Sequence, residues 1–233
     1  MTMVVTGAAV VKEDRYASSR SGWHQARADA LFQLPPLSTI LAKKTSRYGR
    51  FDQYTRLGCA AAGLALHDAG LAGAGQRRIG FILAGQYGSF VTDLAFYETA
   101  AGNGQFASPN LFSYTLPNIM IGECALQFGL TGPTYCLDSD RGRGISALNE
   151  GAWLLAEGEA DAVLVGWLEV PPPHMAQEKE GAVVLVLEKK TAGQAFQLEL
   201  AVERSAGPRL CSGAPVHDIL DVLRALQMAD GQK

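Results

Sequence analysis

The feature that most constrains the fold is the stretch from residue 132 to 169, in which a strand, a turn, a helix and a second strand follow one another. The first strand is expected at residues 135–138, before a glycine-containing turn. The helix is indicated by apolar residues at helical spacing, namely Ile145, Leu148, Ala152 and Leu155. Residues 162–168 are continuously apolar, which is typical of a strand that is covered on both faces. We therefore expect a layered α/β fold with this helix in its interior.

Periodicity elsewhere predicts further strands and helices around this unit. Strands are expected at residues 3–11, 78–84, 182–187 and 197–203. Helices are expected at residues 54–70, 93–101, 119–128 and 219–227. Residues 12–50 show little periodicity, so we expect a long excursion with short helical pieces there. The alternation of the two element types predicts a mixed sheet packed against helices.

The length and charge of the chain limit the classes of partner. Its 233 residues fit one large domain or two small ones, and its net charge of −3 favours neither nucleic acid nor an anionic membrane. It has no apolar run of about eighteen residues and no basic region before its first apolar stretch, so we expect a cytoplasmic protein without a membrane partner. A local basic cluster is either a solvated surface or a site for an acidic protein or a phosphorylated carrier; it comprises Lys43, Lys44, Arg47 and Arg50.

Metal and cofactor sites are not expected. The four cysteines are scattered without CxxC pairs, which favours reduced, buried thiols over a disulfide framework or a metal site. The glycine-rich turn GQYGS at residues 85–89 could expose backbone N–H groups to a phosphate. It completes neither a P-loop nor a dinucleotide fingerprint, so we expect no cofactor.

Four segments resemble those of β-ketoacyl synthases, which belong to the thiolase superfamily. They are residues 47–71, with a basic start, an alanine-rich middle and a DAGL end, and residues 108–135, 158–169 and 181–190. The spacing agrees without gaps from Ser108 to Glu169. The resemblance implies a thiolase-like N-terminal half-fold over residues 1–190. Residues 191–233 would then add an extra strand and a short C-terminal helix to the same domain.

Arg141 departs from the family at its most important position. It stands at the turn between strand and helix where the enzymes carry their active-site cysteine. A guanidinium group stays protonated at physiological pH and has no lone pair with which to attack a carbonyl carbon. Three roles are open for Arg141: a clamp paired with Asp138 or Asp140, a plug in a vestigial entrance, and a ligand for a carrier's phosphate.

The catalytic histidines are a second departure. In the family they lie in the C-terminal half, to which nothing here corresponds, and His217 has no matching motif around it. Cys136 and Ser139 lie near the turn, but no histidine is close in sequence to act as their base. We therefore expect no catalytic residue in this chain.

These departures fit the chain-length-factor-like proteins of type II polyketide systems, and the chain looks most like a short version associated with aryl-polyene-type pathways. The resemblance implies a heterodimer with an active β-ketoacyl synthase across the sheet edge, and an indirect or transient contact with acyl carrier protein. Leu111, Phe112 and Tyr114 match the loop that reaches into the partner's acyl tunnel in the family; ordinary burial of this loop is the alternative.

A lone half-fold raises the question of what covers its central helix. An uncovered apolar helix layer would be a protein interface, and the helix at residues 145–157 is a candidate packing face. Alternatively, the last forty or so residues cover it and give a self-sufficient domain. Two other functions are also open: a decarboxylase or acyltransferase with a displaced nucleophile, and a homodimeric carrier-binding scaffold.

Overall fold

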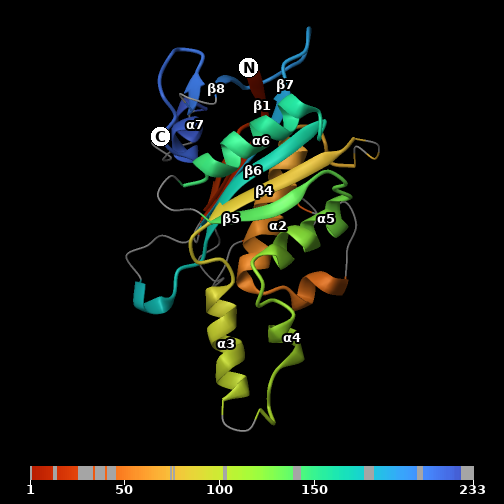
Figure 1. Cartoon of the computed structure of the whole chain (residues 1–233), viewed down its shortest axis with the longest axis vertical. Helices are drawn as coiled ribbons and strands as arrows, with labels where there is room; N and C mark the ends of the chain where they lie inside the picture. The colour runs from red at the N-terminus through yellow and green to blue at the C-terminus, as the bar shows by residue number, and fades with distance from the viewer. Residues whose placement is uncertain are drawn as a thin grey trace.

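The computed structural model describes most of the chain. The described residues are 2–12, 15–25, 34, 40, 46–73, 75, 77–101, 104–138, 143–175, 181–203 and 207–226. Within them the backbone forms a nine-stranded mixed sheet with helices on both faces (Figure 1). Helices α3 and α4 project together beyond one end of the sheet, and we call residues 90–117 the arm.

The helices and strands have the following bounds. The strands are β1 (Thr2–Lys12), β2 (Arg15–Ser18), β3 (Gly22–Gln25), β4 (Ile79–Gly85), β5 (Thr134–Asp138), β6 (Ala162–Glu169), β7 (Gly181–Lys189), β8 (Leu198–Glu203) and β9 (Gly207–Leu210). The α-helices are α2 (Gln53–Asp68), α3 (Phe90–Ala100), α4 (Pro109–Phe112), α5 (Asn118–Phe128), α6 (Ile145–Glu157) and α7 (Ile219–Ala225). Short 3₁₀ helices cover Ser46–Arg50 and Pro173–Met175.

The sheet has parallel pairing at one edge and antiparallel pairing elsewhere. Its strand order is β3-β2-β1-β7-β6-β4-β5, and β8 pairs with both β1 and β9. Strand β4 runs parallel to β5 and β6, whereas β7 is antiparallel to β6 and β1. The carboxyl ends of β4, β5 and β6 therefore meet at one end of the sheet, which is where α/β folds place their sites.

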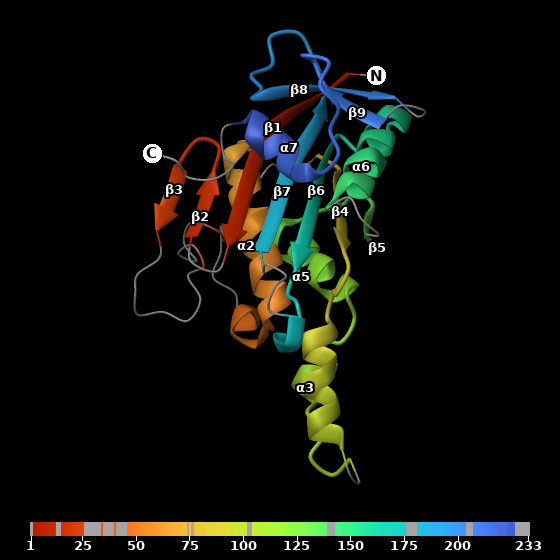
Figure 2. The same cartoon turned by 90° about the vertical axis from the view of Figure 1, so that its left-hand side faces the viewer.

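Each face of the sheet has its own apolar core. Helices α2 and α5 cover one face, and α6 and α7 cover the other (Figure 2). Strand alternation divides β6 between them: Val163 and Val165 pack on the α6 side, and Leu164 and Leu168 pack on the α2 side. Both faces of β6 are therefore buried, which explains why its sequence is a continuous apolar run.

A β-bulge in β1 keeps its side chains on the correct faces. Met3 and Val5 pack on the α6 side, and Ala8 and Val10 pack on that same side although the numbering has changed from odd to even. The register against β7 shifts between Val5 and Gly7, which accounts for the change. Helix α2 approaches so closely here that a Cβ atom on Gly7 would lie 2.4 Å from the carbonyl oxygen of Ala65.

Asp68, at the end of α2, joins four segments of the chain through hydrogen bonds. Its buried carboxylate accepts hydrogen bonds from the backbone N–H groups of Ala8 (2.9 Å) and Arg20 (2.9 Å), and from Gln197 Nε2 (2.8 Å). The hydroxyl of Ser19 donates a further hydrogen bond. Burial alone would raise the pKa of Asp68, but these hydrogen bonds outweigh it and hold the pKa below its usual value.

The expected α/β fold with a mixed sheet is confirmed, and the long strands and helices lie within a few residues of their predicted bounds. Residues 15–25 are different: they form β2 and β3, where we expected short helical pieces. Strand β2 pairs with β1 in a short hairpin, with Val11 opposite Tyr16, and β3 pairs with β2 in the next one, so pairing with a neighbouring strand selects these strands and periodicity does not reveal them. Strand β9 was not predicted either, and it pairs with β8.

Candidate functional site

The turn between β5 and α6 lies at the carboxyl end of the parallel strands. Asp138 is the last residue of β5 and is exposed, whereas Asp140 and Arg141 lie outside the described residues. The chain is described again from Arg143, whose carbonyl oxygen accepts from Ile219 N at 3.0 Å. Gly144 follows with a φ of 80°, and a Cβ atom there would lie 3.1 Å from Trp167 Cβ. The start of α6 is thus held tightly against β6 and α7.

A cavity of about 270 Å³ lies beside this turn. The ends of β4 and β5, the loop after β4, and one residue each from α2 and the arm form its walls. Its lining residues are Tyr54, Leu83, Gly85, Gln86, Tyr87, Gly88, Pro117, Cys136, Leu137 and Asp138. Of the residues predicted from the sequence, Asp138 is therefore the one that the described structure places at this cavity.

Glu169, at the end of β6, holds the loop that forms one wall of the cavity. Its buried carboxylate accepts hydrogen bonds from Gln86 N (2.5 Å) and Tyr87 N (3.1 Å). These two N–H groups belong to the glycine-rich turn that was considered as a phosphate site. In the structure they donate to the carboxylate of Glu169 instead. Glu169 was not predicted as a site residue. The feature of the sequence that could have indicated it is an acidic residue at the end of an otherwise apolar strand.

Two ionisable side chains in the cavity wall are held in their protonated forms. Burial raises the pKa of the Cys136 thiol to about 12, and this thiol donates to the carbonyl oxygen of Pro117 at 3.5 Å. Burial is also the main reason that the pKa of Tyr54 is raised, and the nearby Cys136 and Glu169 raise it further. At neutral pH this wall therefore supplies neither a thiolate nor a phenolate.

None of the four histidines, all of which lie within the described parts of the chain, lines this cavity. His24 stacks on Tyr16, His67 is exposed on α2, and His174 and His217 are exposed. A nucleophile–base pair of the usual kind is thus not assembled there among the described residues.

The three predicted tunnel residues lie in different environments in the structure. Phe112 lies at the end of α4 on the arm, 62% exposed, with its ring 5.3 Å from that of Phe96. Leu111 is half-buried beside it. Tyr114 is buried in the core on the α2 side and lies 6.1 Å from the ring of Phe51. Phe112 can therefore reach a partner, whereas Tyr114 packs within this chain.

Tyr114 instead lines a second cavity, of about 250 Å³, with part of the basic cluster. Arg47 Nε donates to Glu123 Oε2 at 3.0 Å, and Arg47 thus forms an ion pair with the buried carboxylate of Glu123. Arg50 also lines this cavity and is exposed. Lys43 and Lys44 of the predicted cluster lie outside the described residues.

A third cavity, of about 610 Å³, lies at the opposite end of β4 and β6. Four of its charged side chains form ion pairs, Arg78 with Asp161 and Arg77 with Glu188, and Lys189 Nζ donates to the carbonyl oxygen of Ala156. In the described parts of the chain, no three His, Cys, Asp or Glu side chains come together as a metal site requires. None of the helices that the structure describes combines the length and apolar character needed to cross a bilayer.

Large apolar side chains are exposed mainly on the arm and next to it. They are Phe90, Leu94, Tyr97, Phe106, Phe112 and Leu116 of the arm, Leu126 of α5, Met175, and Phe196 before β8. The arm also carries negative charge only, because no Lys or Arg occurs from residue 79 to 140. At the neighbouring sheet edge, β5 pairs with β4 alone among the strands that the structure describes.

Comparison with known proteins identifies the family. The model of the β-ketoacyl synthase N-terminal domain matches residues 18–183. The 3-oxoacyl-(acyl-carrier-protein) synthase 2 of Staphylococcus aureus strain N315 is 27% identical over 137 residues, which are 58% of this chain and 33% of that protein. The same enzyme of strain COL gives the same values. The chain thus spans about a third of the length of the curated relatives it matches.

Solved structures show the same fold. The ishigamide ketosynthase/chain length factor has a TM-score of 0.66 at 19% identity, covering 86% of this chain and 66% of that one. A type II polyketide synthase complex of an acyl-carrier protein with its ketosynthase has a TM-score of 0.68 at 18% identity, covering 86% and 67%. At these identities the likeness establishes the fold, so the expected thiolase-like fold is confirmed. Since the family model matches most of its length, the chain belongs to the β-ketoacyl synthase family, through that family's N-terminal domain.

Proposed function

We propose that this chain is a non-catalytic, ketosynthase-like subunit that forms a heterodimer with an active β-ketoacyl synthase and shapes its acyl tunnel, as a chain length factor does. The observation that carries the proposal is the arginine at position 141, which by its spacing in the resembling segments stands where the family's nucleophile is expected, inside the range matched by the N-terminal domain model. The protonated guanidinium cannot form an acyl-enzyme. No histidine lines the neighbouring cavity, which supports the same conclusion for the described residues.

The free edge of β5 supports a partner of the same fold. An edge strand offers a row of backbone N–H and C=O groups that another strand can pair with. Strand β5 is half-buried along most of its length, between α5 on one face and α6 on the other. A ketosynthase that pairs with this edge would extend the sheet, and α5 and α6 would flank the joint.

The arm supports a partner next to this edge. It projects from the body with apolar side chains such as Tyr97, 70% exposed, and Phe106, 82% exposed. Apolar side chains gathered in this way are typical of a protein interface. The negative charge of the arm, from Asp93 and Glu98, favours a partner whose surface is basic at the rim.

Phe112 is the residue through which the arm would set acyl chain length. Its exposed ring can enter the partner's tunnel, and a packed tunnel does not accept an extra methylene without cost. The change Phe112→Ala should therefore lengthen the product of the complex. Mass spectrometry of the acyl products checks this, and an unchanged distribution of lengths would remove the tunnel role.

Acyl carrier protein is the second proposed partner, and its contact with this chain is indirect or transient. Carrier domains of this kind are acidic, and Arg47, Arg50 and Arg56 give this chain an exposed basic surface at the start of α2. Such a surface would increase the rate of encounter and would respond to salt.

Co-expression with each full-length ketosynthase encoded in the same genome tests the partner role. A stable 1:1 complex on gel filtration, with its mass measured by light scattering, is the expected result. A chain that stays alone with every ketosynthase would contradict the heterodimer, and a stable dimer of the chain by itself would favour a homodimeric scaffold.

Incubation of the purified chain with malonyl- or acyl-carrier protein tests the absence of catalysis. We expect no covalent acyl adduct by intact-mass spectrometry and no release of CO₂. An adduct on Cys136 or Ser139 would show a displaced nucleophile and support a decarboxylase or acyltransferase instead.

A further inference from the structure

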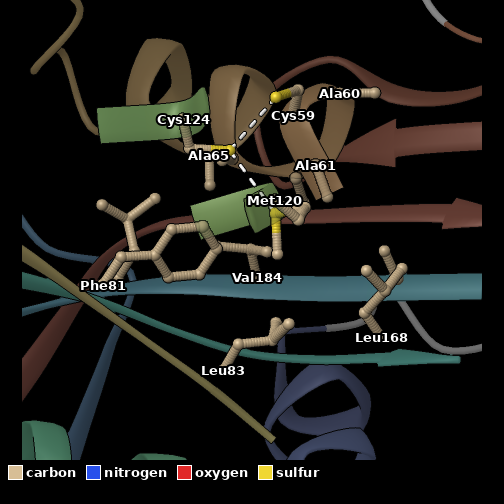
Figure 3. Packing of buried hydrophobic residues seen from close by; sticks show 14 of the residues in the cluster. Cys59, Ala60, Ala61, Ala65, Phe81, Leu83, Met120, Cys124, Leu168 and Val184 are labelled. Carbon is tan, nitrogen blue, oxygen red and sulfur yellow. Dashed lines mark hydrogen bonds between the residues drawn. The ribbon is translucent and has the colours of Figure 1, made fainter. Parts of the chain in front are cut away.

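Two buried cysteines from different helices face each other in the core on the α2 side. Cys59 lies on α2 and Cys124 on α5, and both have 0% exposure. Their Sγ atoms are 3.2 Å apart, within hydrogen-bond distance, although the residues are 65 positions apart in the chain (Figure 3). Both thiols are free in this structure.

The packing around the pair holds the two helices close together. Cys124 Sγ also lies 3.6 Å from Met120 Sδ, one turn earlier on α5. Met120 packs over Gly58 of α2, where an added Cβ atom would lie 2.3 Å from Met120 Sδ. Glycine is thus what lets α5 approach α2 next to the two thiols. A disulfide bond of about 2.05 Å requires the two sulfurs to approach each other by roughly 1.1 Å.

We propose that Cys59 and Cys124 form a reversible disulfide that joins α2 to α5 on two-electron oxidation by a peroxide. One thiol, as thiolate, attacks a peroxide oxygen, so that a sulfenic acid forms and the O–O bond breaks. The second thiol, as thiolate, then attacks that sulfur, the S–S bond forms, and the oxygen leaves as water. Two thiols and one hydrogen peroxide thus give one disulfide and two waters.

Burial makes this couple selective for a small oxidant. Desolvation raises the pKa of Cys124, and the hydrogen bond with Cys59 raises it further, so the thiolate is rare in the closed structure. Hydrogen peroxide is close to water in size and can enter during brief openings of α5, whereas glutathione disulfide requires a much larger opening. We therefore expect peroxide to form the bond much faster than glutathione disulfide does.

The bond would fix two walls of the candidate site. Helix α2 begins next to Tyr54, and α5 begins directly after Pro117, and both of these residues line the cavity beside the β5–α6 turn. A covalent link between the helices would limit how far these walls can separate. The inference does not rest on the proposed partner role, because it concerns the two thiols and the helices that carry them.

The double variant Cys136→Ala/Cys211→Ala keeps only the buried pair and is the protein to oxidise. Treated with hydrogen peroxide under native conditions, it should lose about 2 Da, regain them with dithiothreitol, and give one cross-linked peptide pair. The oxidised form should melt about 5 °C higher than the reduced form. Intact mass, peptide mapping and thermal unfolding measure these changes.

Each alternative result would overturn the proposal. Gain of oxygen on Cys124 without a link, or two thiols that stay reduced while the oxidant is consumed, would show that the pair does not close. A bond that appears only in denaturant would do the same. The matched variants Cys59→Ala and Cys124→Ala should each prevent the mass loss. If the double variant does not fold, peptide mapping of the oxidised wild-type chain decides between a Cys59–Cys124 link and any other.

Discussion

Helix α6 and the arm are both rich in apolar side chains, but the chain covers only one of them. On α6, Leu148 and Leu155 are fully buried in a core that also contains Val222 of α7. On the arm, Phe106 and Leu116 are 82% and 63% exposed. The difference favours the arm and the neighbouring β5 edge, rather than α6, as the surface for the proposed partner.

The C-terminal segment adds to the core in which α6 is buried. Strand β8 continues the sheet beside β1, β9 pairs with β8, and α7 then packs on the same face of the sheet as α6. No large apolar side chain of α6 or α7, both fully described, is exposed. The chain's own last residues thus share one core with α6 on this face of the sheet.

The largest effect is expected when the core on the α6 side is disrupted by Val222→Asp. The substitution places a carboxylate in this apolar core and should lower the free energy of unfolding by about 4 kcal/mol. Urea unfolding measures the change. If residues 1–190 and 191–233 form one domain, all spectroscopic probes should show a single, weakened transition.

The matched control is Arg224→Ala, two residues further along α7. Arg224 is exposed and pairs only with its neighbour Asp221 among the contacts that the structure describes, so its loss should change stability by less than about 0.5 kcal/mol. A stable Val222→Asp protein would mean that α7 does not pack in this core in solution.

The arm should show the opposite behaviour in the variant Phe112→Asp/Leu116→Asp. Both side chains are exposed, so we expect the free energy of unfolding to change by less than about 0.5 kcal/mol. Binding to the partner ketosynthase should weaken by about a hundredfold, because charges would replace apolar side chains in the interface. Calorimetry of the complex measures the affinity, and Phe196→Asp, on the C-terminal segment, is the control that should leave it unchanged.

Features that depend on local interactions could be predicted from the sequence, whereas features that depend on contacts between distant segments could not. The helix at residues 145–157 and the apolar strand after it follow from local periodicity, and both form as expected. The addition of the C-terminal segment to this core depends on the pairing of β8 with β1, across almost the whole chain, and no local pattern encodes it. Likewise Glu169 and Tyr54 come to the site from elements that are distant in sequence, whereas Asp138 ends the strand that precedes the predicted turn.

A smaller effect is expected in the body for Asp68→Asn. An amide would place a donor where the carboxylate accepts hydrogen bonds from Ala8, Arg20 and Gln197, at a cost of about 3 kcal/mol. The folded-state pKa of Asp68 is lowered, so its contribution is present above the usual pKa of an aspartate, near 4, and is lost as the pH falls through the folded value. Wild-type protein should therefore lose stability in acid more steeply than the variant, and urea unfolding at several pH values tests this.

The smallest effect concerns the contact between α6 and the edge strand β5, where Tyr135 of β5 donates to Glu150 of α6 at 2.6 Å. Tyr135→Phe keeps the ring and removes this bond, so we expect a loss of about 1 kcal/mol at neutral pH. Burial and then Glu150 raise the pKa of Tyr135, so its contribution is full below the usual pKa of a tyrosine, near 10, and is lost as the pH rises beyond it. The variant should lose less stability than wild type between neutral and strongly alkaline pH. Equal alkaline sensitivity would show that α6 does not hold the edge strand through this bond, and that the free edge is positioned by β4 alone.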